Sequence, residues 1–293
     1  MMETSHSAVA VLAQNGKSFY FAGVFLPADR LKVISELYSF CRYVDDCADE
    51  LSHDQAKTAV AHIKEVILNS DLSDPLQDQV RLLEKNGVAR TLLLDLVRGA
   101  EWDIHEEPIH TADDLDKYCY HVAGVVGLMM NPLMKVTDPA AASYAVSLGK
   151  AMQLTNICRD ILEDAQNARI YLPATEIRSL GLGLTALATP GAAPTELKTV
   201  LKKYLKLADA SYELGQQGLP YIPLRCRFVI LIASEVYRHI GKKIIKNDFE
   251  VLKGRIYLTV FEKIVVLFKT SPKMLKPAFW LKPLRPNKQV VIS

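Results

Sequence analysis

The chain has 293 residues, of which 49% are hydrophobic, and its formal net charge is only +2. This length suffices for one large hydrophobic core, and the near-neutral charge excludes the strongly basic surface typical of nucleic-acid-binding proteins. The N-terminus has no basic segment ahead of its short apolar run, so no signal peptide is predicted. No apolar stretch approaches the roughly 20 residues of a membrane span. We therefore expect a cytoplasmic protein.

The five cysteines are odd in number and form no CxxC pair. Several of them lie inside apolar helical segments, where a thiol packs as a small hydrophobic group. This pattern favours reduced, buried thiols over a disulfide framework or a zinc site.

Helical periodicity dominates the sequence, and no series of alternating strands is found, so the expected fold class is all-α. Proline and capping signals indicate where helices begin: Pro27, Asp138-Pro139, and the capping-box pairs Ser52/Gln55 and Thr111/Asp114. The predicted helices cover residues 28–51, 56–68, 78–87, 90–104, 113–130, 140–166, 197–217 and 227–245.

Two segments lack this helical pattern. Residues 181–196 collect Gly, Pro and Ala and predict a surface loop, and residues 273–293 are rich in Lys and Pro and predict an irregular tail. We expect one domain over residues 1–293, with residues 1–15 and 272–293 peripheral or flexible.

The segment YSFCRYVDDCADE places polar side chains along one face of the first long predicted helix. Tyr38, Arg42, Asp45 and Asp49 are three, four or seven residues apart, a spacing that stacks side chains on one side of an α-helix. The rest of this helix is largely apolar, and buried carboxylates need a cation or hydrogen bonds. A cation-binding cavity is therefore predicted, with Asp46 in a supporting role; a solvated acidic helix end is the alternative.

The segment QLTNICRDILED repeats this arrangement with oxygen-bearing side chains. Its stripe would run for three turns, with Arg159, Arg169 and Tyr171 close in sequence and able to grip phosphate oxygens. Two facing stripes would form a site for hard divalent ions, which prefer oxygen ligands and bind phosphates. A polar surface face is the alternative. The stripe consists of Gln153, Asn156, Asp160 and Asp164.

The segment YCYHVAGVVGLMM puts Gly124 and Gly127 inside an otherwise strong helix, where each costs about 1 kcal/mol relative to Ala. Either close packing between helices or the approach of an apolar ligand to the backbone would explain them. An apolar wall with a polar head would then be formed by Tyr118, Val122 and Val126.

Taken together, the motifs GKSFYFA, YSFCRYVDDCADE, YCYHVAGVVGLMM, QLTNICRDILEDAQNARIYLP and SEVYRHIG resemble the phytoene/squalene synthase family, in the family's order and over most of the chain. YCYHVAGVVGLMM and the region around SEVYRHIG are most similar to bacterial phytoene synthases. The resemblance implies a single large helix bundle of the isoprenoid synthase type around a central cavity. It also implies a prenyltransferase that condenses two isoprenoid diphosphates head to head.

The resemblance assigns roles to residues of this chain. It implies catalytic roles in the cavity for Tyr38, Arg42, Tyr171 and Tyr237, with core packing as the rival role of Tyr237. Magnesium ligands would be Asp45, Asp49, Asn156, Asp160 and Asp164. Substrate-binding residues would be Lys17, Ser18, Phe19, Arg42, Tyr118, Val122, Val126, Gly127, Gln153, Asn156, Arg159 and Arg169. Asn15-Gly16 departs from the His-Ser of some relatives, which leaves the contacts of the N-terminal segment open.

The implied reaction joins two geranylgeranyl diphosphates through a cyclopropyl diphosphate to give phytoene, with Mg²⁺ as cofactor and Mn²⁺ as the alternative metal. The alternatives are a C30 synthase that uses two farnesyl diphosphates, with NADPH only if squalene is the product, and a non-catalytic relative. Other expected partners are a membrane surface for product release, reached from the inner face, and a downstream desaturase. The basic C-terminal region with Phe279 and Trp280 is the predicted membrane contact.

Overall fold

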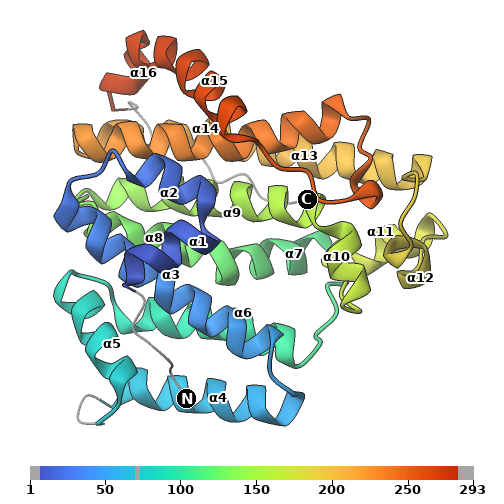
Figure 1. Cartoon of the computed structure of the whole chain (residues 1–293), viewed down its shortest axis with the longest axis horizontal. Coiled ribbons are helices and arrows are strands. Elements are labelled where there is room, and N and C mark those ends of the chain that lie inside the picture. Colours follow the sequence, from blue (N-terminus) through green and yellow to red (C-terminus); the bar gives the residue numbers. More distant parts are fainter. Residues whose placement is uncertain (1–6, 70–72, 283–293) are drawn as a thin grey trace.

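The computed structural model describes residues 7–69 and 73–282, which are almost entirely helical and contain no β-strand (Figure 1). The all-α prediction is confirmed. The α-helices are α1 (Ala8–Asn15), α2 (Lys17–Gly23), α3 (Ala28–Asp49), α4 (His53–Leu68), α5 (Pro75–Lys85), α6 (Arg90–Ile104), α7 (Ala112–Cys119), α8 (Val125–Leu133), α9 (Ala142–Arg159), α10 (Ile161–Gln166), α11 (Ala174–Ser179), α12 (Leu184–Ala188), α13 (Thr195–Gln216), α14 (Leu224–Lys246), α15 (Val260–Thr270) and α16 (Pro277–Trp280). The shorter helical turns are η1 (Tyr120–Gly124), η2 (Pro139–Ala141), η3 (Leu219–Tyr221), η4 (Val251–Lys253) and η5 (Ser271–Leu275).

Local sequence signals locate several helix starts correctly. The capping boxes of Ser52 with Gln55 and of Thr111 with Asp114 open α4 and α7 as predicted. Each supplies acceptors for backbone N–H groups that the first turn of a helix leaves without partners. α3 begins directly after Pro27.

Two predicted helices are interrupted in the structure. The expected helix 113–130 contains the π-helical turn η1 between α7 and α8, and the expected helix 140–166 begins with η2 and breaks at Asp160, between α9 and α10. A π-turn and a break both change the direction of the side chains that follow. The segment 113–130 therefore does not present one continuous face, and the segment 140–166 is not one continuous helix.

Two further predictions were wrong in part. The expected loop 181–196 contains α12, whose Leu187 is buried, and residues 273–282 of the expected irregular tail form η5 and α16. Residues 1–6 and 283–293 lie outside the described residues. No helix was predicted at the position of α15, although Thr259 and Glu262 form a capping box that signals its start.

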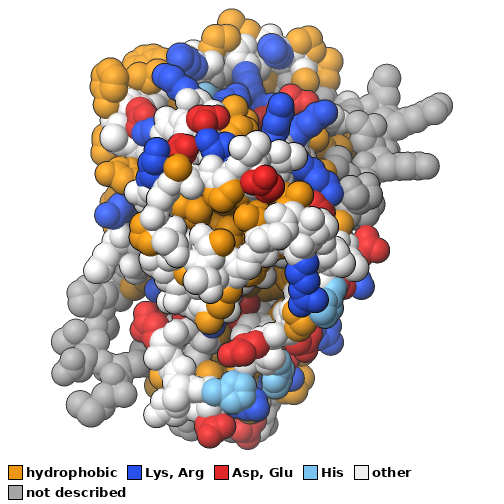
Figure 2. Space-filling view, turned by 90° about the vertical axis from the view of Figure 1, so that its right-hand side faces the viewer, with side chains coloured by type: hydrophobic (Ala, Val, Ile, Leu, Met, Phe, Trp, Pro, Cys, Tyr) orange, Lys and Arg blue, Asp and Glu red, His pale blue; other side chains and the backbone are white. Residues whose placement is uncertain are grey.

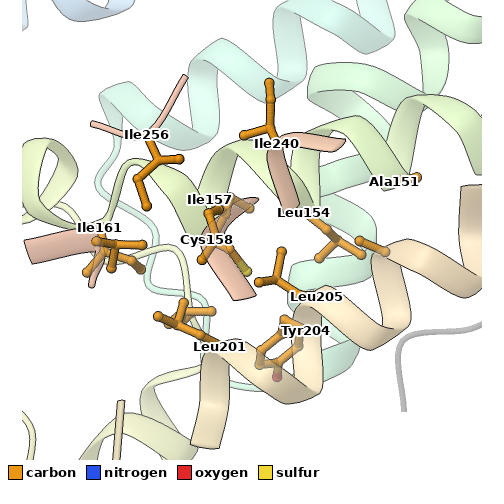
Figure 3. Packing of buried hydrophobic residues seen from close by; sticks show 14 of the residues in the cluster. Ala151, Leu154, Ile157, Cys158, Ile161, Leu201, Tyr204, Leu205, Ile240 and Ile256 are labelled. Atoms are coloured by element: carbon orange, nitrogen blue, oxygen red, sulfur yellow. The ribbon is translucent and has the colours of Figure 1, made fainter. Parts of the chain in front are cut away.

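Helix α9 lies at the centre of the bundle, where it packs against α13, α14, α8 and η1 (Figure 1). Figure 3 shows part of this core, in which Leu154, Ile157 and Cys158 of α9 lie above side chains of α13. A second buried cluster joins α3, α4, α5, α6 and α8. The candidate site lies between these two clusters. In the part of the chain that the structure describes, all five cysteines are free, as predicted.

Glycines allow α9 to lie unusually close to its neighbours. A Cβ on Gly127 would overlap the carbonyl oxygen of Ala145, and a Cβ on Gly149 would overlap the carbonyl oxygen of Ala123. The helices therefore cross with backbone in contact with backbone. This geometry favours the packing explanation for Gly127, because the α9 backbone occupies the space that a substrate would need.

We expect Gly149→Ala to lower the free energy of unfolding by about 1–3 kcal/mol, because the added methyl group cannot fit without moving the α9 crossing. Urea denaturation would measure the change. Gly191→Ala is the matched control, since no atom lies within 4 Å of the Cβ position there. Equal midpoints for the wild type and Gly149→Ala would contradict the prediction.

Candidate active site

The two carboxylate motifs face each other across the bundle and are joined by Arg169. Its guanidinium donates one hydrogen bond to the Asp49 carboxylate on α3 and another to the Ala48 carbonyl oxygen at 3.3 Å. Arg169 follows the second motif, so this ion pair connects residues that are 120 positions apart. The predicted juxtaposition of the two motifs is therefore found in the structure.

The second motif keeps its spacing through the break at Asp160. The Asp160 N–H donates to the Asn156 carbonyl at 2.9 Å, and the Asp164 N–H donates to the Asp160 carbonyl at 2.9 Å. Successive ligand candidates therefore still lie one turn apart. Arg159 grips the Asp160 carboxylate with two hydrogen bonds, of 2.8 and 2.5 Å.

The side chain of Asn156 has one hydrogen-bonded atom and one buried atom without a hydrogen-bond partner. Its amide nitrogen donates weakly to the Gln153 side-chain oxygen at 3.4 Å, while its side-chain oxygen is buried and has no hydrogen-bond partner. An unpaired buried acceptor is costly, and a cation satisfies it.

The carboxylates of the site have raised pKa values. Burial, followed by repulsion from Asp49 and Asp103, raises the pKa of Asp45 to about 7. Burial, followed by repulsion from Asp160 and Glu163, raises the pKa of Asp164 to about 8. Protein atoms surround Asp45 closely enough to raise its pKa, yet the residue keeps solvent-accessible surface. Asp45 therefore faces a space among the helices rather than packed side chains. These carboxylates lack positive charge, and a divalent cation would supply it.

Among residues 7–69 and 73–282, no three carboxylate, His or Cys side chains lie close enough to hold a metal ion by themselves. Mg²⁺ is usually held by one or two carboxylates together with water and substrate phosphates. The residues present therefore fit magnesium bound jointly with a diphosphate. Asp45 and Asp49 would contribute from α3, and Asn156, Asp160 and Asp164 from α9 and α10.

Asp103 on α6 is a central residue that the sequence reading missed. Its carboxylate accepts hydrogen bonds from the hydroxyl groups of Tyr118 (3.1 Å) and Tyr171 (3.0 Å), whose rings are stacked with centroids 4.9 Å apart. Burial raises the pKa of Asp103 to about 6, against the opposing effect of Arg169. No motif spacing distinguishes Asp103 in the sequence, because its partners come from α7 and from the segment between α10 and α11.

Arg255 was also missed. Its Nε lies 3.1 Å from an Asp160 carboxylate oxygen, and its guanidinium reaches Glu163 at 3.4 Å. It lies between η4 and α15, outside any helix, where periodicity predicts nothing. Arg255 adds positive charge next to the second motif.

Three aromatic rings form a cluster beside the two carboxylate motifs. The Phe19 ring of α2 lies 4.9 Å from that of Tyr237 and 6.4 Å from that of Tyr38. Burial raises the pKa of Tyr38 to about 12 and also raises that of Tyr237, so both hydroxyl groups stay protonated. In the same segment, Ser18 is half-buried and Lys17 is exposed.

Other predicted residues lie elsewhere. Arg42 pairs with Asp46 at 2.6 Å and with Glu50 at 3.7 Å, so Asp46 holds the arginine at the edge of the stripe. Val122 packs with the α9 core, whereas Val126 packs with the α3–α6 core, since η1 intervenes between Tyr118 and Val126. The continuous wall that the sequence predicts is thus divided between two clusters.

Comparison with known proteins identifies the family. Residues 12–262 match the family described as squalene/phytoene synthase. The chain belongs to this family. It is 35% identical over 268 residues to the 15-cis-phytoene synthase of Enterobacter agglomerans, with 87% of this chain and 90% of that protein covered. It is 32% identical to the 15-cis-phytoene synthase of Pantoea ananas, with 95% and 94% covered.

Solved structures of the squalene/phytoene synthase family share the fold. A dehydrosqualene synthase crystallised with a ligand is 29% identical, with a TM-score of 0.82 and 92% of this chain and 95% of that chain covered. A squalene synthase from Alicyclobacillus acidocaldarius is 20% identical, with a TM-score of 0.71 and 83% and 94% covered, a likeness of fold alone. The chain is thus a prenyltransferase of this family with an isoprenoid synthase fold.

We expect Asp103→Asn to lower kcat for prenyl transfer by about 100-fold, because a misplaced Tyr118 or Tyr171 disturbs the cavity around the reacting chains. Steady-state kinetics on prenyl diphosphates would measure the loss. Asp113→Asn, an exposed exchange on α7, is the control. An unchanged kcat for Asp103→Asn would rule out the positioning role.

Mg²⁺ and inorganic diphosphate together should raise the Tm of the protein more than either alone, since ligands that bind only the folded state stabilise it. The increase should be larger at pH 8 than at pH 6, because Asp45, with a pKa of about 7, is ionised only at the higher pH. Asp45→Asn should remove most of the increase, and Asp29→Asn, at the exposed start of α3, should keep it. An undiminished increase in Asp45→Asn would overturn the metal assignment.

Proposed function

We propose that this protein is a phytoene synthase, which condenses two geranylgeranyl diphosphates head to head. The observation that carries the proposal is the pair of facing carboxylate motifs, joined by Arg169 and short of positive charge. The naming of curated relatives at 32–35% identity as 15-cis-phytoene synthases supports the C20 substrate.

In the proposed reaction, the first donor loses its diphosphate and leaves an allylic cation. The double bond of the second donor captures this cation, and loss of a proton closes a cyclopropane ring that still carries one diphosphate. Loss of the second diphosphate, rearrangement and loss of a second proton then give the hydrocarbon. Bound Mg²⁺ would neutralise the charge that develops on the leaving diphosphate.

Several residues of this chain would have distinct roles in these reaction steps. Arg159 and Arg255 lie beside Asp160 and add positive charge where the diphosphate would bind. Asp103 orients the stacked rings of Tyr118 and Tyr171, whose faces can stabilise a nearby carbocation. The packed apolar helices exclude water that would otherwise quench the cation.

The main rival product is a C30 hydrocarbon, which the likeness to a dehydrosqualene synthase supports. Purified protein with Mg²⁺ should form phytoene from geranylgeranyl diphosphate without NADPH, as identified by chromatography and mass spectrometry. A C30 hydrocarbon as the better product, from farnesyl diphosphate, would contradict the phytoene assignment. Asp45→Asn and Asp160→Asn should abolish turnover by either route while the circular dichroism spectrum stays unchanged.

The product of this reaction is a hydrocarbon without a polar group, so its transfer from water into an apolar phase is strongly favourable. We propose that it passes to a membrane, where a desaturase would take it up. Among the described residues, no helix is both long and apolar enough to span a bilayer. Delivery would therefore depend on a surface of the protein.

A further inference from the structure

The outer face of α15 carries large apolar side chains that no part of the described chain covers. Val260, Phe261 and Phe268 are 67%, 74% and 71% exposed, and Ile264 lies between them. Phe261, Ile264 and Phe268 are three, four or seven positions apart, with Val260 directly before Phe261, so they form one stripe along the helix. Exposed apolar residues are common singly, but a continuous stripe marks an interaction surface.

The inner face of the same helix is buried and mixes apolar and polar residues: Val266 packs in the main core, with Lys263 and Thr270 buried beside it. Lys263 is 7% exposed, and its Nζ donates to the Lys17 carbonyl oxygen of α2 at 3.3 Å. Both α15 and α2 pack on α14. The stripe thus lies on a helix that reaches α2 through Lys263, and the Phe19 ring of α2 lies next to Tyr237 in the candidate active site.

The chain segment that contains the stripe is rich in basic residues. Residues 253–282 contain seven Lys or Arg and one acidic residue, a net charge of +6, whereas the whole chain has only +2. The single acid, Glu262, is paired with Lys243 at 2.7 Å. Figure 2 shows hydrophobic side chains along the upper edge of the molecule, with Lys and Arg between them, at the height of α15 in Figure 1. The exposed members of this set are Lys253, Arg255, Lys269, Lys276 and Lys282. Lys253, Arg255 and Lys282 pair with acids outside the segment, whereas Lys269 and Lys276 form no ion pair among the described residues.

We propose that α15 docks this protein on a bilayer of anionic phospholipids, with the stripe among the acyl chains and the lysines at the headgroups. An amphipathic helix with bulky apolar residues and flanking lysines has the composition of an interfacial helix. A second copy of the chain is disfavoured as the occupant, because it would bring an equally positive face against this one.

The predicted membrane contact in the basic C-terminal region stays a prediction, with a change in its members. Phe279 is 4% exposed and packs against the Arg227 guanidinium, so it is not available to a bilayer. Trp280 is 53% exposed, and its indole N–H donates to the Met274 carbonyl oxygen at 2.7 Å. The proposal rests on the proposed function for its purpose, since apolar substrate tails and product would enter and leave beside α2.

Vesicle flotation of the purified full-length protein tests the proposal without substrate. The wild type should bind vesicles of phosphatidylcholine mixed with phosphatidylglycerol, bind phosphatidylcholine alone weakly, and detach as salt screens the lysines. The double variant Phe261→Ser/Phe268→Ser should bind at least about tenfold more weakly. Leu68→Ser, which removes an equally exposed side chain at the far end of the molecule on α4, is the matched control.

The double variant should retain circular dichroism, Tm and turnover of detergent-dispersed substrate, so that a failure of docking is separate from a failure of the proposed chemistry. No binding of the wild type to anionic vesicles, or equal binding by the double variant, would overturn the proposal. A dimer in sedimentation velocity that the double variant loses, without vesicle binding, would also overturn it and assign the stripe to self-association.

Discussion

The structure depends on carboxylates that repel each other and are held together by the surrounding helices. Asp45, Asp103 and Asp164 approach from α3, α6 and α10, and each has a pKa raised first by burial. Such an arrangement is unfavourable by itself, and the rest of the bundle offsets its cost. The repulsion between these carboxylates is the property that would attract a divalent cation with its diphosphate.

Backbone contact at α9 makes this arrangement possible. The helix that carries Asn156 crosses η1 and α8 at Gly149 and Gly127, and its other side packs on α13. Dense packing on both sides leaves the helix little freedom to move away from the repelling charges. Arg169 then bridges the remaining gap to Asp49, and Arg159 and Arg255 pair with Asp160. The pKa values of Asp45 and Asp164 stay raised, so these two carboxylates are the ones that a bound cation would neutralise.

Features carried by a single helix could be predicted from the sequence. Tyr38, Asp45 and Asp49 share a face of α3 because their spacing matches the helical period, and capping boxes located the starts of α4 and α7. Contacts between distant elements could not be predicted, such as the hydrogen bonds that Tyr118 and Tyr171 donate to Asp103. Arg255 escaped for the same reason, since only tertiary packing brings it to Asp160.

The two faces of α15 suggest how an apolar reaction is served by a protein without a described membrane-spanning helix. Burial of Lys263 against α2 lowers the pKa of its ammonium group, so its inward position has a cost. That orientation leaves the phenylalanines outside, where water solvates them poorly. An anionic bilayer removes this exposure and attracts the neighbouring lysines. Because Lys263 of α15 contacts α2, and Phe19 of α2 lies beside Tyr237, the same contact would bring the lipid phase near the aromatic residues of the site.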